Sequence, residues 1–422
     1  MIHSALRRGP SDTLPPMLPL LRLHLPRCFA FAPPRTRVAL ALAVGLLSWT
    51  GVAGAVLIAT GDGTGNTTPP LSDPGFANVG ATSNGLSAVY VRNGWVLTAN
   101  HVGENAVTFG GVTHEPIAGS RIRFQNSDGT LADLIAFKLQ TRPALPDLAI
   151  TDQAPSAGDL ITVIGNGRNR GAETSFQGID GWAWGSGRSI RWGTNRISDV
   201  DQVELNTRSF VTIFDFVSQP PSGQHEADIV NGDSGGGAFV GSGPSAELIG
   251  ILFARASFVD QPPGTSIYGN LGLIADLFAY RDDLLAVIDQ PDCDDGLDDD
   301  GDGLIDHPAD PGCTSPTDES EREASLTCDN GVDDDGDGLI DLLDPSCAEP
   351  GDTDERGPLY ACDNGLDDDL DSFTDYPDDP DCLHPTNPSE LPEPGIGIPL
   401  ALGALALAAR TRRSTYSSRS TL

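Results

Sequence analysis

A serine set among glycines, Ser234 in the stretch "NGDSGGGAFV", has the surroundings expected of a reactive nucleophile. Two other stretches supply possible partners, since "GWVLTANHV" contains His101 and "ADLIAFKLQ" contains Asp133. A histidine can remove the proton of a serine hydroxyl, and an aspartate can hold that histidine in the tautomer required. In the chain order His, Asp, Ser, the three residues predict nucleophilic attack on a carbonyl carbon.

The glycines around Ser234 indicate how the reaction intermediate is stabilised. Glycine lets the backbone approach a substrate closely, so we expect the N–H groups of Gly232 and Ser234 to form an oxyanion hole. Loss of one such donor typically removes ~2.7–4 kcal/mol of transition-state stabilisation. A β-carbon at position 232 is therefore expected to affect the rate far more than the folding.

The segments that must position these residues are predicted to be short strands. From about residue 56 to 290, runs such as "SAVYV", "WVLTA", "LITVIG" and "LIGILFA" recur between Gly, Asn, Asp and Pro turns. Many short strands at this spacing predict an all-β sandwich or pair of barrels. The end of the region differs, because apolar residues in "GLIADLFAYRDDLLAVIDQ" recur at helical spacing. We expect one closing amphipathic helix there, built on Leu273, Ile274, Leu277, Phe278, Leu284, Leu285 and Ile288.

Together the three motifs resemble the trypsin/chymotrypsin family of serine proteases. "LTANH" stands where that family has Leu-Thr-Ala-Ala-His, "DLIAFKL" where it has Asp-Ile-Ala-Leu-Leu-Lys-Leu, and "GDSGG" is its nucleophile motif. The resemblance covers about residues 56–290 and implies two packed six-stranded antiparallel barrels with the active site between them. It also implies a serine-type endopeptidase that acts on protein or peptide substrates and needs no cofactor for catalysis.

Asp147 in "LPDLAI" is an alternative to Asp133 as the aspartate of the triad. After Asp133 the chain has room for a strand and then a link between barrels before the strand "LITVIGNG" begins. From Asp147 the same strand begins too soon for a last strand of the first barrel and a linker. We therefore expect Asp133 to orient His101.

The resemblance also bears on specificity and activation. Asp228 stands where trypsin-like members have the floor of the primary specificity pocket, which implies pairing with a substrate Arg or Lys. Arg255 stands near the wall of that pocket and could neutralise Asp228 or fill the space, which favours a small or unusual side chain instead. In the family a new N-terminus pairs with the aspartate before the nucleophile, here Asp233, and Val56 lies at a suitable distance upstream.

The net charge of −35 is concentrated in one part of the 422-residue chain. Residues 291–390 hold 34 of the 60 acidic residues and only two basic ones, Arg322 and Arg356. So acidic a chain does not bind nucleic acid through its overall field. The same segment carries six of the seven cysteines, which indicates that it is a separate unit.

The acidic segment is a threefold repeat of about 35 residues, seen in "CDDGLDDDGDGLIDHPADPGC", "CDNGVDDDGDGLIDLLDPSC" and "CDNGLDDDLDSFTDYPDDPDC". The simplest disulfide pairing is Cys293–Cys313, Cys328–Cys347 and Cys362–Cys382, although six cysteines allow 15 connectivities. The spacing of acids and glycine resembles calcium loops of EF-hand or thrombospondin type 3 kind, and carboxylate oxygens suit Ca²⁺. The alternative is a solvated spacer with three disulfide loops. The expected ligands are Asp298, Asp300, Asp302, Asp306, Asp333, Asp335, Asp337, Asp341, Asp344, Asp367, Asp369, Asp371, Asp375 and Asp378.

Both ends of the chain resemble targeting segments. Residues 1–55 read as a leader and signal peptide, because the apolar run "VALALAVGLLSW" precedes Ala53-Gly54-Ala55 and predicts a mature start near Val56. Met17 is an alternative start of translation. Residues 391–422 contain Pro-Glu-Pro, an apolar run and arginines, and resemble PEP-CTERM sorting signals, with a plain membrane anchor as the alternative. We expect an exported protein of a Gram-negative-type bacterium, extracellular or at the cell surface, whose tail meets a sorting protease or the membrane.

Three functions are compatible with these patterns. The one that we favour is an exported serine endopeptidase that is tethered or sorted at the cell surface. The others are a peptide-binding or adhesion protein with little turnover on a protease fold, and a serine esterase that uses the same triad.

Overall fold

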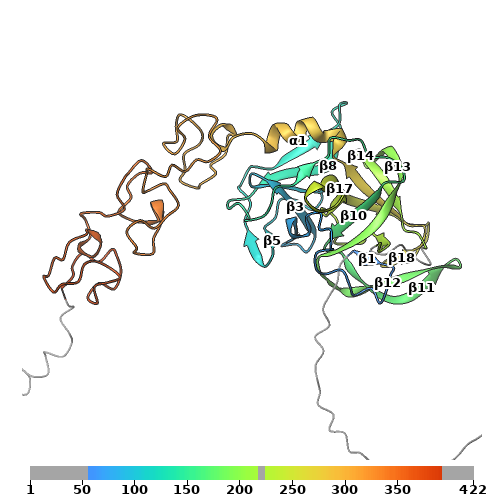
Figure 1. Ribbon diagram of the computed structural model, residues 1–422, viewed down its shortest axis with the longest axis horizontal. Helices are drawn as coiled ribbons and strands as arrows, with labels where there is room; N and C mark the ends of the chain where they lie inside the picture. The colour runs from blue at the N-terminus through green and yellow to red at the C-terminus, as the bar shows by residue number, and fades with distance from the viewer. Residues whose placement is uncertain (1–55, 217–223, 392–422) are drawn as a thin grey trace, which may run out of the picture. The chain divides into compact units, whose positions relative to one another are not determined.

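The computed structural model describes residues 56–216 and 224–391. Figure 1 shows that the regular structure of the described chain before the helix α1 is mainly strands and that the described chain after it is mainly loops. The predicted leader at residues 1–55 and the predicted sorting segment from residue 392 onward lie outside the described residues.

The first sheet is antiparallel and has seven strands in the order β6-β5-β2-β3-β4-β8-β7. Its strands are β2 (Val79–Thr82), β3 (Ser87–Arg92), β4 (Trp95–Thr98), β5 (Val107–Phe109), β6 (Val112–His114), β7 (Ile122–Gln125) and β8 (Leu131–Lys138). The turn between β3 and β4 is made by Asn93 and Gly94, whose φ values are 51° and 78°. Positive φ at both positions suits the tight turn that joins two twisted antiparallel strands.

The second sheet closes into a barrel of six strands. Its order is β16-β10-β13-β14-β19-β17, the ring is closed by pairing of β16 with β17, and the short β9 adds parallel to β17. The strands are β9 (Ala149–Ile150), β10 (Leu160–Gly165), β13 (Arg191–Glu204), β14 (Thr207–Ile213), β16 (Gly237–Val240), β17 (Glu247–Ala256) and β19 (Leu271–Asp276). The predicted all-β, chymotrypsin-like fold is confirmed. Both sheets contain seven strands, and in the second sheet six of the seven form the closed ring.

Two small sheets lie beside the barrel. A long hairpin, β11 (Arg168–Phe176) and β12 (Ile179–Arg188), pairs with β18 (Thr265–Ile267). The two-residue strand β1 (Leu57–Ile58) pairs with β15 (Ala227–Asp228) and brings the start of the described chain to the interior. The motifs did not reveal the hairpin, because its glycine-rich sequence shows no regular alternation of polar and apolar residues.

The closing helix is shorter than expected. The only α-helix among the described residues, α1, spans Arg281–Ile288 and buries Leu284 and Ile288. Leu273 and Ile274 belong to strand β19, so the prediction of helix there is wrong. Successive apolar residues are compatible with a strand at this point, because both of its faces are buried in the packed barrel. In the described ranges, no helix has both the length and the apolar character needed to cross a membrane.

Single turns of 3-10 helix complete the regular structure. They are η1 (Phe76–Asn78), η2 (Gly243–Ser245), η3 (Phe278–Tyr280), η4 (Asp292–Asp294), η5 (Asp341–Leu343) and η6 (Ala361–Asp363).

One apolar core joins the two sheets. It contains Val89 and Leu97 from the first sheet and Ile251 and Phe253 from the second, all of them fully or almost fully buried. Burial of such side chains contributes roughly 1.5–3 kcal/mol each, so the sheets are held firmly together. The loops that carry the predicted catalytic residues extend from strands that this core fixes.

The acidic segment is organised by three disulfides rather than by strands or α-helices. The pairs are Cys293–Cys313, Cys328–Cys347 and Cys362–Cys382, which confirms the simplest pairing. We call the three disulfide loops and their flanking residues repeats 1, 2 and 3, in chain order.

Lys138, at the end of β8, links the protease-like part to repeat 1. Its Nζ lies 2.9 Å from Oδ1 of Asp292, 2.6 Å from Oδ2 of Asp295 and 2.5 Å from Oδ2 of Asp299. The side chains of Lys138 and Asp295 are each only 2% exposed. Burial lowers the pKa of Lys138, but the neighbouring carboxylates outweigh burial and raise that pKa above its usual value. A buried ion cluster therefore joins two parts of the chain that sequence patterns had separated.

Candidate active site

His101 and Asp133 are brought together by the pairing of two strands. His101 lies in the turn after β4, and β4 pairs with β8, which carries Asp133. The backbone N–H of His101 donates to Oδ1 of Asp133 at 2.9 Å, and Nδ1 of its ring lies 2.8 Å from Oδ2. Burial would raise the pKa of Asp133, yet the hydrogen bonds from His101 lower it below its ordinary value. The aspartate is thus held as a carboxylate that orients the ring.

The alternative aspartate has no such role. Asp147 is exposed, just before β9, and within the described residues it makes no hydrogen bond to His101. The two oxygens of Asp133 hold both the backbone and the ring of the histidine, so the geometry favours the predicted choice.

The loop that carries Ser234 packs against the strands that lead to His101. The carbonyl of Ser234 accepts a hydrogen bond from the N–H of Ser87 at 2.9 Å, and the carbonyl of Ser87 accepts from Thr98 Oγ1 at 2.8 Å. Gly235 has φ 86°, and a β-carbon there would lie 1.9 Å from the Ser87 carbonyl oxygen. Only glycine allows this close approach, which holds the half-buried Ser234 near the β4 end.

Ser234 and His101 are not yet bonded to one another. Within residues 56–216 and 224–391, Oγ of Ser234 shares no hydrogen bond with the His101 ring. In proteins without bound substrate this contact is often long and tightens on binding. The histidine side chain is 44% exposed, so a substrate can reach its free ring nitrogen.

The backbone around Ser234 offers two free donors. In the part of the chain that the structure describes, the N–H groups of Gly232 and Ser234 donate to no protein acceptor. The carbonyl of Gly232 accepts from Ser87 Oγ at 2.8 Å, which fixes the peptide plane that follows it. Two N–H groups at the nucleophile are the arrangement that stabilises an oxyanion.

The expectation that a β-carbon at Gly232 would spare the fold is wrong. Gly232 has φ 111°, and a β-carbon would lie 2.5 Å from the carbonyl oxygen of Asn166 and 2.9 Å from the Cα of Gly167. Both are backbone atoms, so the loop itself would have to shift. Substitution there disturbs the structure as well as the chemistry.

Asp233 is completely buried beside the start of the described chain. Its Oδ2 accepts the N–H of Val230 at 2.8 Å, and its Oδ1 lies 3.4 Å from the backbone nitrogen of Val56, which is itself fully buried. Burial raises the pKa of Asp233 to about 7. Val56 has φ 28°, a value that a β-branched residue adopts only under strain. The carboxyl group is therefore held by N–H donors, and the guanidinium groups of Arg188 and Arg191 lie near enough to interact with it electrostatically.

Asp228 is paired from within the protein. Nη2 of Arg255 donates to Oδ2 of Asp228 at 3.1 Å and to Oδ1 of Asn270 at 2.7 Å. The guanidinium also lies over the ring of Trp184, 5.1 Å from its centroid, and the Trp184 Nε1 donates to Oγ of Ser266 at 3.0 Å. Burial raises the pKa of Asp228 even though Arg255 opposes the rise. The predicted pocket floor is thus already neutralised.

The hairpin supplies two residues that the motifs did not mark. Trp184 covers Arg255, and Arg188 donates through Nη2 to Oδ1 of Asn231 at 2.6 Å and through Nη1 to the carbonyl of Gly85. Burial lowers the pKa of Arg188. A guanidinium therefore stands next to the loop of Gly232. The paired tryptophans of "GWAWG" were the one signal in the sequence, and they fit packing equally well.

The structure divides the predicted metal ligands into two groups. One group gathers its carboxylates: Asp298, Asp300 and Asp302 lie together, as do Asp335, Asp337 and Asp344. In the other group Asp306, Asp341 and Asp375 each accept N–H groups that follow the first cysteine of their repeat. Backbone N–H groups also donate to members of the first group, as Gly301 and Gly303 do to Asp298. Asp333 and Asp367 likewise accept N–H groups of their own loops. In repeat 3, Asp369 is half-buried, and Asp371 and Asp378 are exposed.

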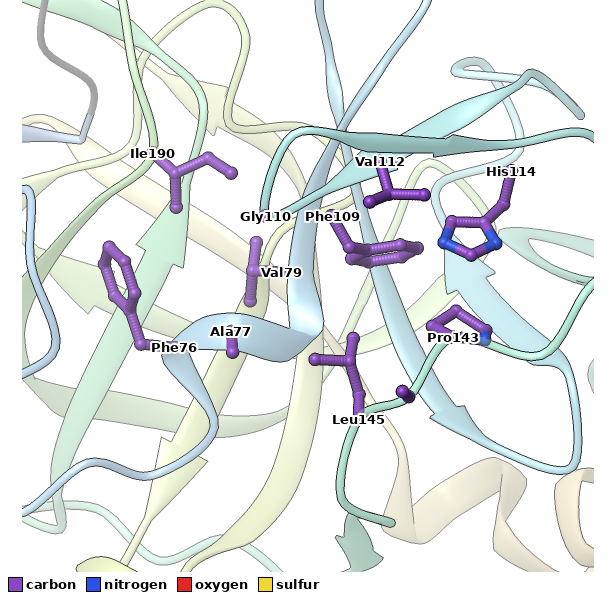
Figure 2. Close-up of a pocket in the computed structure, with 11 residues that line it drawn as sticks. Phe76, Ala77, Val79, Phe109, Gly110, Val112, His114, Pro143, Leu145 and Ile190 are labelled. Carbon is purple, nitrogen blue, oxygen red and sulfur yellow. The ribbon is translucent and has the colours of Figure 1, made fainter.

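An apolar pocket of about 640 Å³ lies apart from these residues (Figure 2). Its lining includes Phe76, Phe109, Leu145 and Ile190, together with His114, whose Nδ1 is engaged with Oγ1 of Thr141 at 2.8 Å. None of the predicted site residues contributes to it. The pocket has no nucleophile and does not alter the assignment of the site.

Comparison with known proteins agrees with the fold. Residues 64–270 match the family model described as Trypsin. Solved structures similar to this chain include human heparin binding protein, at 18% identity over 54% of this chain and 96% of the other, with a TM-score of 0.37. Another is neuropsin, a serine protease expressed in the limbic system of mouse brain, at 16% identity over 53% and 97%, with a TM-score of 0.36. No curated protein matches the chain.

Proposed function

Because residues 64–270 have the fold of the trypsin family of serine proteases, we propose that this protein is a serine endopeptidase. The observation that carries the proposal is the double hold of Asp133 on His101, at 2.9 Å to the backbone nitrogen and 2.8 Å to Nδ1. This hold directs the other ring nitrogen away from Asp133, as a general base requires.

Each residue then has one chemical task. Oγ of Ser234 attacks the carbonyl carbon of the peptide bond while Nε2 of His101 takes its proton. The oxyanion that forms accepts the N–H groups of Gly232 and Ser234. His101 returns the proton to the leaving amine, and water, activated by the same histidine, hydrolyses the acyl-enzyme. Asp133 stabilises the imidazolium throughout.

Labelling with a fluorophosphonate tests this proposal directly. We expect the probe to attach to Ser234, and Ser234→Ala to abolish both labelling and peptide hydrolysis without loss of folding. Ser245→Ala, at an exposed serine of η2, is the matched control and should behave like the parent protein. A folded protein that does not label would instead be a peptide-binding protein, and turnover of esters without turnover of matched peptides would identify an esterase.

The side-chain preference follows from the pairing of Asp228. Arg255 and Asn270 already occupy this region, and Trp184 covers the guanidinium. A substrate Arg or Lys would have to displace Arg255 to reach the carboxylate, which costs the existing ion pair. The proposed enzyme therefore cleaves after small, uncharged residues rather than after basic ones.

Maturation and location are part of the same proposal. Cleavage after Ala55 would turn the Val56 nitrogen into an ammonium beside Asp233 and would remove the strained φ of Val56, which exists only while residue 55 is attached. The three disulfides indicate an extracellular protein. The sorting tail would then hold or release it at the surface of a Gram-negative-type bacterium. The acidic repeats would bind Ca²⁺, a role that their clustered carboxylates support.

A further inference from the structure

The three repeats bury carboxylate oxygens that have no partner. Among the described residues these atoms are Oδ2 of Asp302, Asp310, Asp329, Asp337, Asp344 and Asp379. Burying an ionised carboxylate without a partner costs much free energy. Such oxygens therefore indicate that a positive charge binds beside them. Their recurrence at matching positions shows that the arrangement is built into the repeat.

The clearest group combines two repeats. Asp335, Asp337 and Asp344 belong to repeat 2, and each brings a carboxylate oxygen within 4.8 Å of the others and of Asp363. Asp363 directly follows Cys362, the first cysteine of repeat 3. Asp363 is only 2% exposed, and Asp344 is 1% exposed. Four acidic groups from neighbouring repeats thus face one another in the interior.

The same arrangement occurs one repeat earlier. Asp329 directly follows Cys328 of repeat 2, is 2% exposed, and reaches back to repeat 1. A β-carbon on Gly312 of repeat 1 would lie 2.5 Å from Oδ2 of Asp329. Asp329 also lines one pocket together with Asp300 and Asp302 of repeat 1. Asp300 and Asp302 of repeat 1 correspond to Asp335 and Asp337 of repeat 2.

From these contacts we propose that Ca²⁺ binds between consecutive repeats, where three carboxylates of one repeat meet the first aspartate of the next. The first site comprises Asp300, Asp302, Asp310 and Asp329, three of which have a buried oxygen without a partner. The second comprises Asp335, Asp337, Asp344 and Asp363. Oxygen-only donor sets of this kind suit Ca²⁺, which completes its shell with carbonyls or water. This placement of the sites rests on the proposed calcium binding by the repeats, and it adds the residues that coordinate each Ca²⁺.

Repeat 3 lacks the residue that would complete a third site. Asp379 is 1% exposed and has an unpartnered oxygen, but the described residues after Cys382, which end at Leu391, contain no further Cys-Asp pair. Its loop is also strained, because Leu370 and Ser372 have φ values of 68° and 83° where repeat 2 has Gly336 and Gly338. Two strong sites are therefore expected. Each one ties a repeat to its neighbour, so that metal fixes their spacing.

Calorimetric titration of the full-length protein, stripped of metal and titrated with CaCl₂, tests the placement. The parent protein should bind two Ca²⁺ tightly. Asp329→Asn and Asp363→Asn should each weaken one site by tenfold or more and leave the other unchanged. Asp294→Asn is the matched control, because Asp294 also follows the first cysteine of its repeat but is exposed and has no repeat before it. Intact mass should confirm three disulfides in every variant.

The outcomes separate the two proposals. Absence of heat with millimolar CaCl₂ in the parent protein would overturn calcium binding itself. Normal binding by the parent and by both asparagine variants would overturn only the placement between repeats. Equal weakening by Asp294→Asn would also overturn it, because the effect would then come from overall charge.

Discussion

The backbone nitrogen of Val56 lies 3.4 Å from Oδ1 of Asp233, although 177 positions separate the two residues in the chain. Strand β1 reaches this place by pairing with β15, one residue of which is Asp228. Val56, the loop of Ser234 and the region of Asp228 are therefore parts of one local structure. A substitution in any one of them is expected to affect the structure of the other two.

The free amino group of Val56 is expected to be required for full activity. Protein that begins at Val56 should be active, whereas protein that retains Ala55 should lose about 10²-fold in kcat/KM, since small displacements of catalytic groups have effects of this size. N-terminal sequencing identifies the first residue of each form, and peptide hydrolysis measures its kcat/KM. Equal rates for both forms would show that N–H donors alone hold Asp233.

Asp133→Asn should reduce kcat by about 10⁴-fold, because an amide cannot stabilise the imidazolium and favours the wrong tautomer of His101. Asp147→Asn is the matched control and should have little effect, since Asp147 is exposed and away from His101. Steady-state kinetics on one peptide substrate compares them. A larger loss in the Asp147 variant would reverse the assignment of the two aspartates.

Arg255→Gly should extend cleavage to peptides with Arg at the position before the scissile bond. Removing Arg255 exposes Asp228 to the substrate, so kcat/KM for such peptides should rise at least tenfold. The variant should also lose about 3–5 kcal/mol of stability, because a buried carboxylate loses its partner. The double variant Asp228→Asn, Arg255→Gly should lack the new activity. If it keeps that activity, Asp228 is not the group that binds the substrate cation.

Glu226 should make stability fall as the pH rises. Burial, with smaller contributions from Asp215 and Asp228, raises its pKa from 4.5 to about 8. The folded state therefore holds a proton that the unfolded state releases, and the free energy of unfolding should decrease between about pH 4.5 and 8. The slope is up to about 1.4 kcal/mol per pH unit. Urea unfolding at pH 5 and pH 8 should show this loss in the parent protein.

Glu226→Gln is the matching variant. Its amide oxygen can still accept the N–H of Asp215, as Oε1 of Glu226 does at 2.9 Å, but it carries no titrating group. The variant should be more stable than the parent at pH 8 and should depend less on pH. An unchanged slope would assign the pH dependence to other residues.

Motifs with fixed neighbours could be predicted from the sequence, and features that depend on tertiary contact could not. "GDSGG" and the strand after Asp133 are local patterns, and the paired cysteines of each repeat lie in one short loop. The extent of α1 was misjudged because a buried strand such as β19 shows the same run of apolar residues as a helix. Arg188 and Trp184 lie in a hairpin whose neighbours are set by folding alone. Asp329 and Asp363 seemed to begin their own repeats, whereas their side chains belong to the repeats before them.

The ion cluster of Lys138 also determines where the chain can be cut without loss of buried ion pairs. A cut between residues 290 and 291 would take away Asp292, Asp295 and Asp299 and leave an ammonium that had been almost completely covered. A cut that spares these ion pairs would have to lie beyond repeat 1. The released part would keep an acidic repeat, and with it Asp300, Asp302 and Asp310, three of the four proposed ligands of the first site.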